Sequence, residues 1–144
     1  MASAPDTDFD TENDADLRQK QITTVAARRG QASFRASLLS AYEGRCCITE
    51  CDLVDALEAA HISPYRGSQS NHPQNGLLLR ADIHTLFDLG LMAVDQNKKL
   101  ILAPPLALSQ AYSSLTGMTL REPSDRRLAP SREALRKHRE WSGL

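Results

Sequence analysis

The sequence predicts an α+β domain, and three observations predict it. Helical patterns of apolar residues occupy both ends of the chain, at about residues 16–42 and 132–141. Between them lie short apolar runs of strand length, first at about residues 57–62 and then on both sides of a polar turn at 95–99. The length of 144 residues fits one domain that can bury a hydrophobic core.

The N-terminal part divides into a tail and two helices. Residues 1–16 hold six acidic side chains, no Lys or Arg and few apolar residues, which predicts a disordered acidic tail. From Asp16 to about Tyr42, apolar residues recur at helical spacings, and Gly30 divides this stretch into two helices. The second helix is expected to bury Phe34.

The central part predicts strands, a loop and a helix. Short strands are expected at Cys46–Thr49 and at about Leu57–Ile62. The stretch from Pro64 to Gln74 is rich in Gly, Ser, Asn and Pro, which indicates a loop. Ala81 to Leu89 reads as a helix that ends at Gly90.

The C-terminal part predicts a hairpin followed by two helices. Apolar runs flank residues 95–99, and Pro104-Pro105 is expected to end the resulting hairpin. A helix is predicted from Leu106 to Leu115. Ser131 is a suitable N-cap for a basic helix that begins at Arg132, with Trp141 as its apolar anchor.

Charge is distributed unevenly along the chain. The formal net charge is −1, but residues 17–144, the single expected domain, carry 17 basic and 12 acidic side chains. A basic body suits a polyanionic partner, although charge alone favours a solvated surface with a solubilising tail. The sequence contains no apolar run of membrane-spanning length and no signal-peptide core, so a soluble, cytoplasmic protein without a membrane partner is expected.

Three cysteines, Cys46, Cys47 and Cys51, lie close together in the sequence. An odd, clustered set is a poor disulfide framework and fits a reducing compartment. Structural zinc usually takes four Cys or His ligands, often as two separated pairs, and no second Cys pair exists here. Buried or free thiols are therefore favoured over a zinc-stabilised interaction module.

The residues best suited to chemistry are His61, Asn75 and His84. Phosphodiester hydrolysis needs a base that accepts a proton from water near neutral pH, and an imidazole suits this task. It also needs a Lewis acid to stabilise charge on the phosphate, and a histidine can ligate such a metal. An asparagine amide can orient a base or brace a loop.

These residues stand in phrases that together resemble the HNH endonucleases, which are built on the ββα-metal fold. The resemblance runs from about Arg28 to Asp95, with the core at about residues 43–95. The phrases that carry it are Gly30-Gln31-Ala32-Ser33-Phe34-Arg35, Arg45-Cys46-Cys47-Ile48-Thr49, Glu58-Ala59-Ala60-His61-Ile62, Asn75-Gly76-Leu77-Leu78-Leu79 and His84-Thr85-Leu86-Phe87-Asp88. The resemblance implies a ββα-metal core with N-terminal helices, a following β-hairpin and C-terminal helices.

The resemblance also implies the catalytic roles. His61 would be the general base, Asn75 would brace the loop and strand beside it, and His84 would bind a divalent metal ion from the helix. Many HNH enzymes have Asp or His, a second metal ligand, directly before the base, and this chain has Ala60 there.

Two carboxylates are candidates for the missing ligand. Glu58 shares a strand face with Ala60, and Asp88 shares a helix face with His84. Glu58 could instead pair with an arginine, and Asp88 could bond to backbone near Gly90. A carboxylate suits Mg²⁺ or Mn²⁺, and an imidazole also tolerates Ni²⁺ or Zn²⁺.

The expected function is metal-dependent hydrolysis of DNA, as found in restriction and antiphage defence. Arg66, in the loop after His61, and Arg80, before the metal-binding helix, are candidates to clamp DNA phosphates. A homodimer would supply two sites for two strands, and a fused or separate sensing or specificity domain would select the DNA. The alternative is a non-catalytic nucleic-acid-binding module with a degenerate site, which Ala60 supports.

Overall fold

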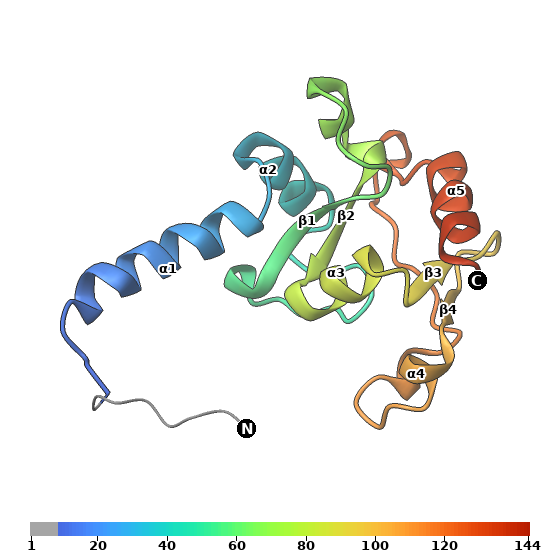
Figure 1. Cartoon of the computed structure of the whole chain (residues 1–144). Coiled ribbons are helices and arrows are strands. Elements are labelled where there is room, and N and C mark those ends of the chain that lie inside the picture. The colour runs from blue at the N-terminus through green and yellow to red at the C-terminus, as the bar shows by residue number, and fades with distance from the viewer. Residues whose placement is uncertain (1–8) are drawn as a thin grey trace.

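The computed structural model describes residues 9–144 and shows a mixed α+β architecture, as the sequence predicts. The described part contains five α-helices and four strands, and the strands form two separate antiparallel pairs (Figure 1). The elements are α1 (Asp14–Arg28), α2 (Ala32–Ala41), β1 (Leu57–His61), β2 (Gly76–Arg80), α3 (Ala81–Asp88), β3 (Met92–Val94), β4 (Leu100–Leu102), α4 (Pro104–Ala107) and α5 (Arg132–Ser142).

Helix α1 begins inside the stretch that was expected to be a disordered tail. Asp14 and Asp16 form part of its first turn, where negative side chains interact favourably with the positive end of the helix dipole. The expected boundary at residue 16 is therefore two residues late, and residues 1–8 lie outside the described part of the chain. Helix α1 buries none of its side chains and projects away from the other elements (Figure 1).

Gly30 separates the two N-terminal helices, as predicted, because the chain turns sharply there against β1. Its φ of 107° is in the region that favours glycine, and a Cβ at this position would lie 3.0 Å from the Cβ of Ala59. The neighbouring Arg29 carbonyl accepts a hydrogen bond from the backbone N–H of Ala59 at 2.8 Å. Helix α2 is thereby placed against the hairpin that β1 forms with β2.

The central hairpin pairs β1 with β2, and His61 lies opposite Gly76 at the end that the connecting loop closes. A Cβ on Gly76 would come within 2.9 Å of the side-chain ends of Phe34 and Leu38, so a larger residue there would displace these two side chains of α2. Helix α3 follows β2 directly and contacts both strands. This β1–β2–α3 unit is the ββα arrangement that the resemblance implied.

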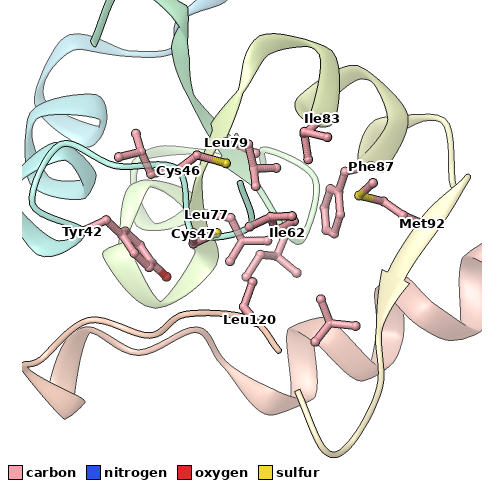
Figure 2. Close-up of a cluster of buried hydrophobic side chains, with 14 of the residues drawn as sticks. Tyr42, Cys46, Cys47, Ile62, Leu77, Leu79, Ile83, Phe87, Met92 and Leu120 are labelled. Atoms are coloured by element: carbon pink, nitrogen blue, oxygen red, sulfur yellow. The ribbon is translucent and has the colours of Figure 1, made fainter. Parts of the chain in front are cut away.

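The core lies around this unit and extends toward the second hairpin. Figure 2 shows Leu77 and Leu79 of β2 among Ile83 and Phe87 of α3 and Met92 of β3, and all five are buried. The second hairpin, β3–β4, forms as predicted.

The expected strand at Cys46–Thr49 is wrong, because this segment is a turn. Its hydrogen bonds go to different partners: Cys46 N–H donates to the Cys51 carbonyl and Cys47 N–H to the Leu78 carbonyl. The thiols of Cys46 and Cys47 are buried among apolar side chains (Figure 2). In residues 9–144 no three His, Cys, Asp or Glu side chains are arranged to hold one metal ion, so this cluster gives no support to a structural zinc site.

The expected helix at 106–115 is also wrong. Pro104 and Pro105 begin helix α4, because their fixed φ suits a first helical turn, and this helix ends at Ala107. The Ser109 carbonyl then accepts from both Tyr112 and Ser113 N–H, which forms turns in place of a continued helix.

Helix α5 begins as predicted, because the Ser131 side chain accepts a hydrogen bond from the Ala134 N–H at 3.1 Å. Leu135 and His138 are its buried side chains, whereas Trp141 is 63% exposed and does not serve as the predicted buried anchor. No helix among residues 9–144 is long and apolar enough to span a bilayer.

Candidate functional site

A groove of about 630 Å³ lies where the end of β1, helix α3 and helix α5 meet. It contains His61 and His84, the two histidines that the sequence motif singled out. Its other lining residues are Arg28, Gly30, Ala59, Ile62, Ser63, Pro64, Arg66, Asp88, Ala134, Lys137, His138 and Trp141. Strand, helix and loop residues from four separate parts of the chain therefore meet at one place.

His61 is the last residue of β1, and its imidazole is held from two sides. The ring of Phe34 stacks on it with a centroid separation of 4.5 Å and an interplanar angle of 7°. The Nε2 atom lies 2.8 Å from the Asn71 amide oxygen. Because that oxygen only accepts hydrogen bonds, Nε2 donates in this contact, and in the neutral imidazole Nδ1 then has the free lone pair.

Asn75 does not line the groove but braces the loop that forms one of its edges. Its Oδ1 accepts from the Ser63 N–H at 2.8 Å, and its Nδ2 donates to the carbonyls of Ser63 and Ser70 at 3.1 and 3.0 Å. The Asn75 carbonyl also accepts from the Ile62 N–H. One side chain thus ties Ser63, near the start of the loop, and Ser70, in its second half, to the residue that precedes β2.

His84 lies between two carboxylates. Its Nδ1 is 2.7 Å from Glu58 Oε1, and its Nε2 is 3.1 Å from Asp88 Oδ2. Burial by itself lowers the pKa of His84, but the hydrogen bonds and negative charges of Asp88 and Glu58 outweigh it, and the pKa is raised above the usual value. The imidazole is therefore stabilised in its protonated form when no other cation is bound.

The two carboxylates face opposite nitrogens of the ring, so they cannot both share one ion with His84. Asp88 and His84 line the groove, whereas Glu58 is 8% exposed and is not one of the lining residues. An imidazole nitrogen and one carboxylate, completed by water and phosphate oxygens, fit a divalent cation such as Mg²⁺ or Mn²⁺, which keeps several of its waters. Ala60 is fully buried and contributes no ligand.

The two predicted phosphate-binding arginines are placed differently. Arg66 is exposed and lines the groove. Arg80 lies outside it, and its guanidinium binds both carboxylate oxygens of Asp82, at 2.6 and 2.9 Å. Hydrogen bonds from Arg80 lower the pKa of Asp82 despite its partial burial, and Tyr112 adds another bond to this carboxylate. This pairing occupies the guanidinium that was expected to bind phosphate.

Sequence patterns do not indicate three residues of the site. Asn71 sits in a polar loop, where an asparagine is an ordinary turn residue, so nothing in the pattern indicates its contact with His61. The sequence suggests a surface or packing role for His138, and packing is the correct part: its ring stacks on Phe87 at 3.7 Å. Lys137 lies beside it in a basic run, and only the position of α5 brings it to the groove.

The ββα fold and the paired histidines are features of a known class of nuclease, and the comparison with protein families points to the same class. Residues 46–95 match a family model described as HNH endonuclease. The matched segment contains the whole β1–β2–α3 unit with His61, Asn75 and His84. Residues 46–95 are therefore similar to the HNH endonucleases, which confirms the resemblance that the sequence motifs indicated.

A solved structure shares the fold. The chain is similar to a protein described as "Modification dependent TagI restriction endonuclease", with a TM-score of 0.51 and 19% sequence identity. The similarity covers 73% of this chain and 35% of that chain, so the present chain spans about a third of the length of its structural neighbour. At this identity the likeness establishes the fold. The comparison with curated proteins found no significant match.

Proposed function

We propose that the protein is a metal-dependent endonuclease that hydrolyses phosphodiester bonds in DNA. The observation that carries this proposal is the presence of His61 and His84 in one groove, each held by specific partners. Arg66 lies beside them with an exposed guanidinium suited to a phosphate. The HNH family match supplies the reaction class.

In this proposal His61 is the general base. Hydrogen bonding to Asn71 keeps the proton on Nε2, so that Nδ1 is free to accept a proton from the attacking water. Stacking on Phe34 fixes the plane of the ring, and the Asn75 brace fixes the loop that carries Asn71. The base is thus oriented before substrate binds, which lowers the entropic cost of reaction.

His84 Nε2 and Asp88 would hold the divalent ion, which would supply Lewis-acid stabilisation of the phosphate charge. Glu58 would accept the Nδ1–H of His84 and so orient the ligand from behind, an arrangement common for metal-binding histidines. The proposed ion is Mg²⁺ or Mn²⁺ because the donor set contains a carboxylate and leaves room for water.

The test is cleavage of supercoiled plasmid DNA by the purified full chain with Mg²⁺, Mn²⁺, Ni²⁺ or Zn²⁺, with and without chelator. We expect metal-dependent nicking that His61→Ala slows by about 10²–10⁴-fold, the usual contribution of a general base. His72→Ala is the matched control, since His72 lies outside the groove.

A His61→Ala variant that cuts as fast as the wild type would overturn the assignment of the base. Binding of DNA without cleavage under any of these ions would favour the alternative function, a non-catalytic nucleic-acid-binding module, for which Ala60 at the usual ligand position is the supporting observation.

We also propose a role in restriction or antiphage defence, in line with the restriction activity that the name of the structural neighbour states for that protein. One such site cuts one strand, so double-strand cleavage would require two copies, as in a homodimer. A fused or separate sensing domain would supply DNA selection. The reduced thiols of Cys46, Cys47 and Cys51 are compatible with the cytoplasm.

A further inference from the structure

One face of helix α5 forms a wall of the groove. Ala134, Lys137, His138 and Trp141 all line it, and these positions recur at the three- and four-residue spacing of a single helical face. The acidic residues of this helix are engaged elsewhere, since Glu133 and Glu140 both pair with Arg136. The groove face of α5 is therefore basic and aromatic.

This wall is fixed to the helix that carries His84. The His138 ring stacks on Phe87 of α3, and its Nε2 donates to the Phe87 carbonyl at 3.0 Å. One edge of the Trp141 indole packs against Gly90 just after α3, where a Cβ would lie only 3.0 Å from the ring. The position of Trp141 relative to His84 is thus set by direct contacts between the two helices.

The charges that face the groove are mostly positive and unpaired. Arg28, Arg66 and Lys137 line it, and no salt bridge involves them within the described part of the chain. Asp88, the one acidic lining residue, is the proposed metal ligand. A surface with this excess of positive charge attracts a polyanion.

The exposure of Trp141 on this surface is not explained by packing within the chain. A tryptophan usually buries much of its large apolar area, yet this indole is 63% exposed and lies beside unpaired cations. Aromatic side chains next to positive charge are the combination that binds unstacked nucleobases, because every base presents a flat π-face.

We propose that the α5 wall binds the nucleic-acid strand that is held in the groove, with the indole of Trp141 stacked on a nucleobase and Lys137 bound to a backbone phosphate. The proposal rests on the proposed nuclease function, because it names substrate contacts of the same site. It assigns substrate binding to the C-terminal helix, which lies outside the segment that matches the HNH family model.

Trp141 is the only tryptophan in the chain, so its fluorescence reports this one contact. The full chain with His61→Ala, which is expected to slow cleavage strongly, is titrated with a single-stranded oligonucleotide, the corresponding duplex, heparin and polyglutamate. We expect saturable quenching by DNA, strongest for the single strand, because stacking on a base quenches indole emission. Heparin, which has charge but no bases, is expected to bind with little quenching, and polyglutamate is not expected to compete with DNA.

Variants test the two contacts separately through the anisotropy of a labelled oligonucleotide. Trp141→Ala should weaken binding by on the order of 5- to 100-fold, while Trp141→Phe should retain most of the affinity because it keeps an aromatic face. Leu108→Ala, at a residue that is 86% exposed and outside the groove, should leave affinity unchanged. Lys137→Ala should weaken binding and reduce the salt slope by about one, whereas Arg132→Ala, on another face of α5, should not.

DNA binding that leaves the fluorescence of Trp141 unchanged, or Trp141→Phe and Trp141→Ala variants that bind like the parent, would overturn this proposal. Quenching by polyglutamate as strong as that by DNA would also overturn it and indicate an acidic protein partner. Thermal melting of each variant separates lost contact from lost folding. Quenching without plasmid nicking by the wild type would reject only the nuclease function, and nicking without quenching would reject only the Trp141 contact.

Discussion

The His84 imidazole lies between two carboxylates that have different surroundings. Asp88 is on the groove side, and Glu58 is buried behind the ring. Both raise the pKa of His84, so a proton and a metal ion compete for Nε2. The site therefore has two proposed states. His84 is protonated at Nε2 when no metal is bound, and it has lost that proton when the metal is bound.

We predict that Mn²⁺ affinity increases with pH until His84 loses its proton. Since the pKa of His84 is raised, the increase should continue above the usual histidine value of about 6.5. Calorimetric titration at several pH values should show Asp88→Asn and His84→Ala as the weakest binders. Glu58→Gln should bind better than either, because its amide oxygen still accepts from Nδ1, and His72→Ala should match wild type.

Equal affinity of His84→Ala and wild type would show that the ion binds elsewhere. A greater loss of Mn²⁺ affinity in Glu58→Gln than in Asp88→Asn would place the ion at Nδ1 of His84 rather than at Nε2.

The tautomer of His61 depends on one amide oxygen. We predict that Asn71→Ala lowers the cleavage rate by about tenfold or more, because the proton is then free to move to Nδ1, a change that corresponds to about 1.4 kcal/mol of barrier. Asn71→Asp should instead shift the acid limb of the pH–rate profile upward, since a carboxylate beside the imidazole raises its pKa. Steady-state kinetics over about pH 5–9, the range in which a histidine changes charge, measures both effects.

A purely structural asparagine would not move the pH profile. If Asn71→Asp lowers the melting temperature and leaves that profile in place, Asn71 does not act on the base.

The loop between β1 and β2 depends on a single internal brace. Asn75 makes three hydrogen bonds to backbone groups of this loop, two to Ser63 near its start and one to Ser70 in its second half. We predict that Asn75→Ala lowers the free energy of unfolding by about 1–3 kcal/mol, because it leaves half-buried backbone groups without partners. It should also reduce cleavage, since the loop carries Asn71. Denaturant unfolding and plasmid nicking, measured on the same preparation, test both parts.

Gln74→Ala is the matched control for the brace. Gln74 is adjacent to Asn75, and its side chain makes one hydrogen bond, to the Arg127 carbonyl. If Asn75→Ala has the same free energy of unfolding and the same nicking rate as the wild type, Asn75 is only a turn residue and does not brace the loop.

The molecule as a whole separates its charges along the chain. Residues 17–144 are net positive, and the six acidic side chains before them have no basic counterpart in their own segment. We predict that neutralising Asp6, Asp8, Asp10 and Glu12 with Asn or Gln strengthens DNA binding at low salt, because their charges repel or displace the phosphates. These four positions precede α1, so its first turn stays intact.

The effect should fade as the salt concentration rises, which anisotropy titrations between about 50 and 300 mM NaCl would show. Weaker DNA binding by the neutralised variant would mean that the acidic segment takes part in the interface.

The sequence by itself determined β1, α3, the second hairpin and the motif residues, whereas the pairing of β1 with β2 into a ββα unit was implied only by the family resemblance. The spacing of apolar residues and the preferences of turn and cap residues are local properties of the chain. They are enough to predict β1, α3, the second hairpin and the Ser131 cap of α5. The motif phrases indicated His61, Asn75 and His84, and the family match covers all three. Local pattern failed at Cys46–Thr49 and at 106–115, where hydrogen bonds to distant or turn partners replaced the expected regular elements.

Only the tertiary structure decided which side chains meet at the groove. Asn71 reaches His61 because its loop folds back over the end of β1, and Arg80 is withdrawn because Asp82 holds it. Trp141 faces the groove because α5 docks on α3 through His138 and Gly90. Such contacts join residues that are far apart in the chain, and their geometry depends on the packing of whole elements, which no spacing in the sequence records.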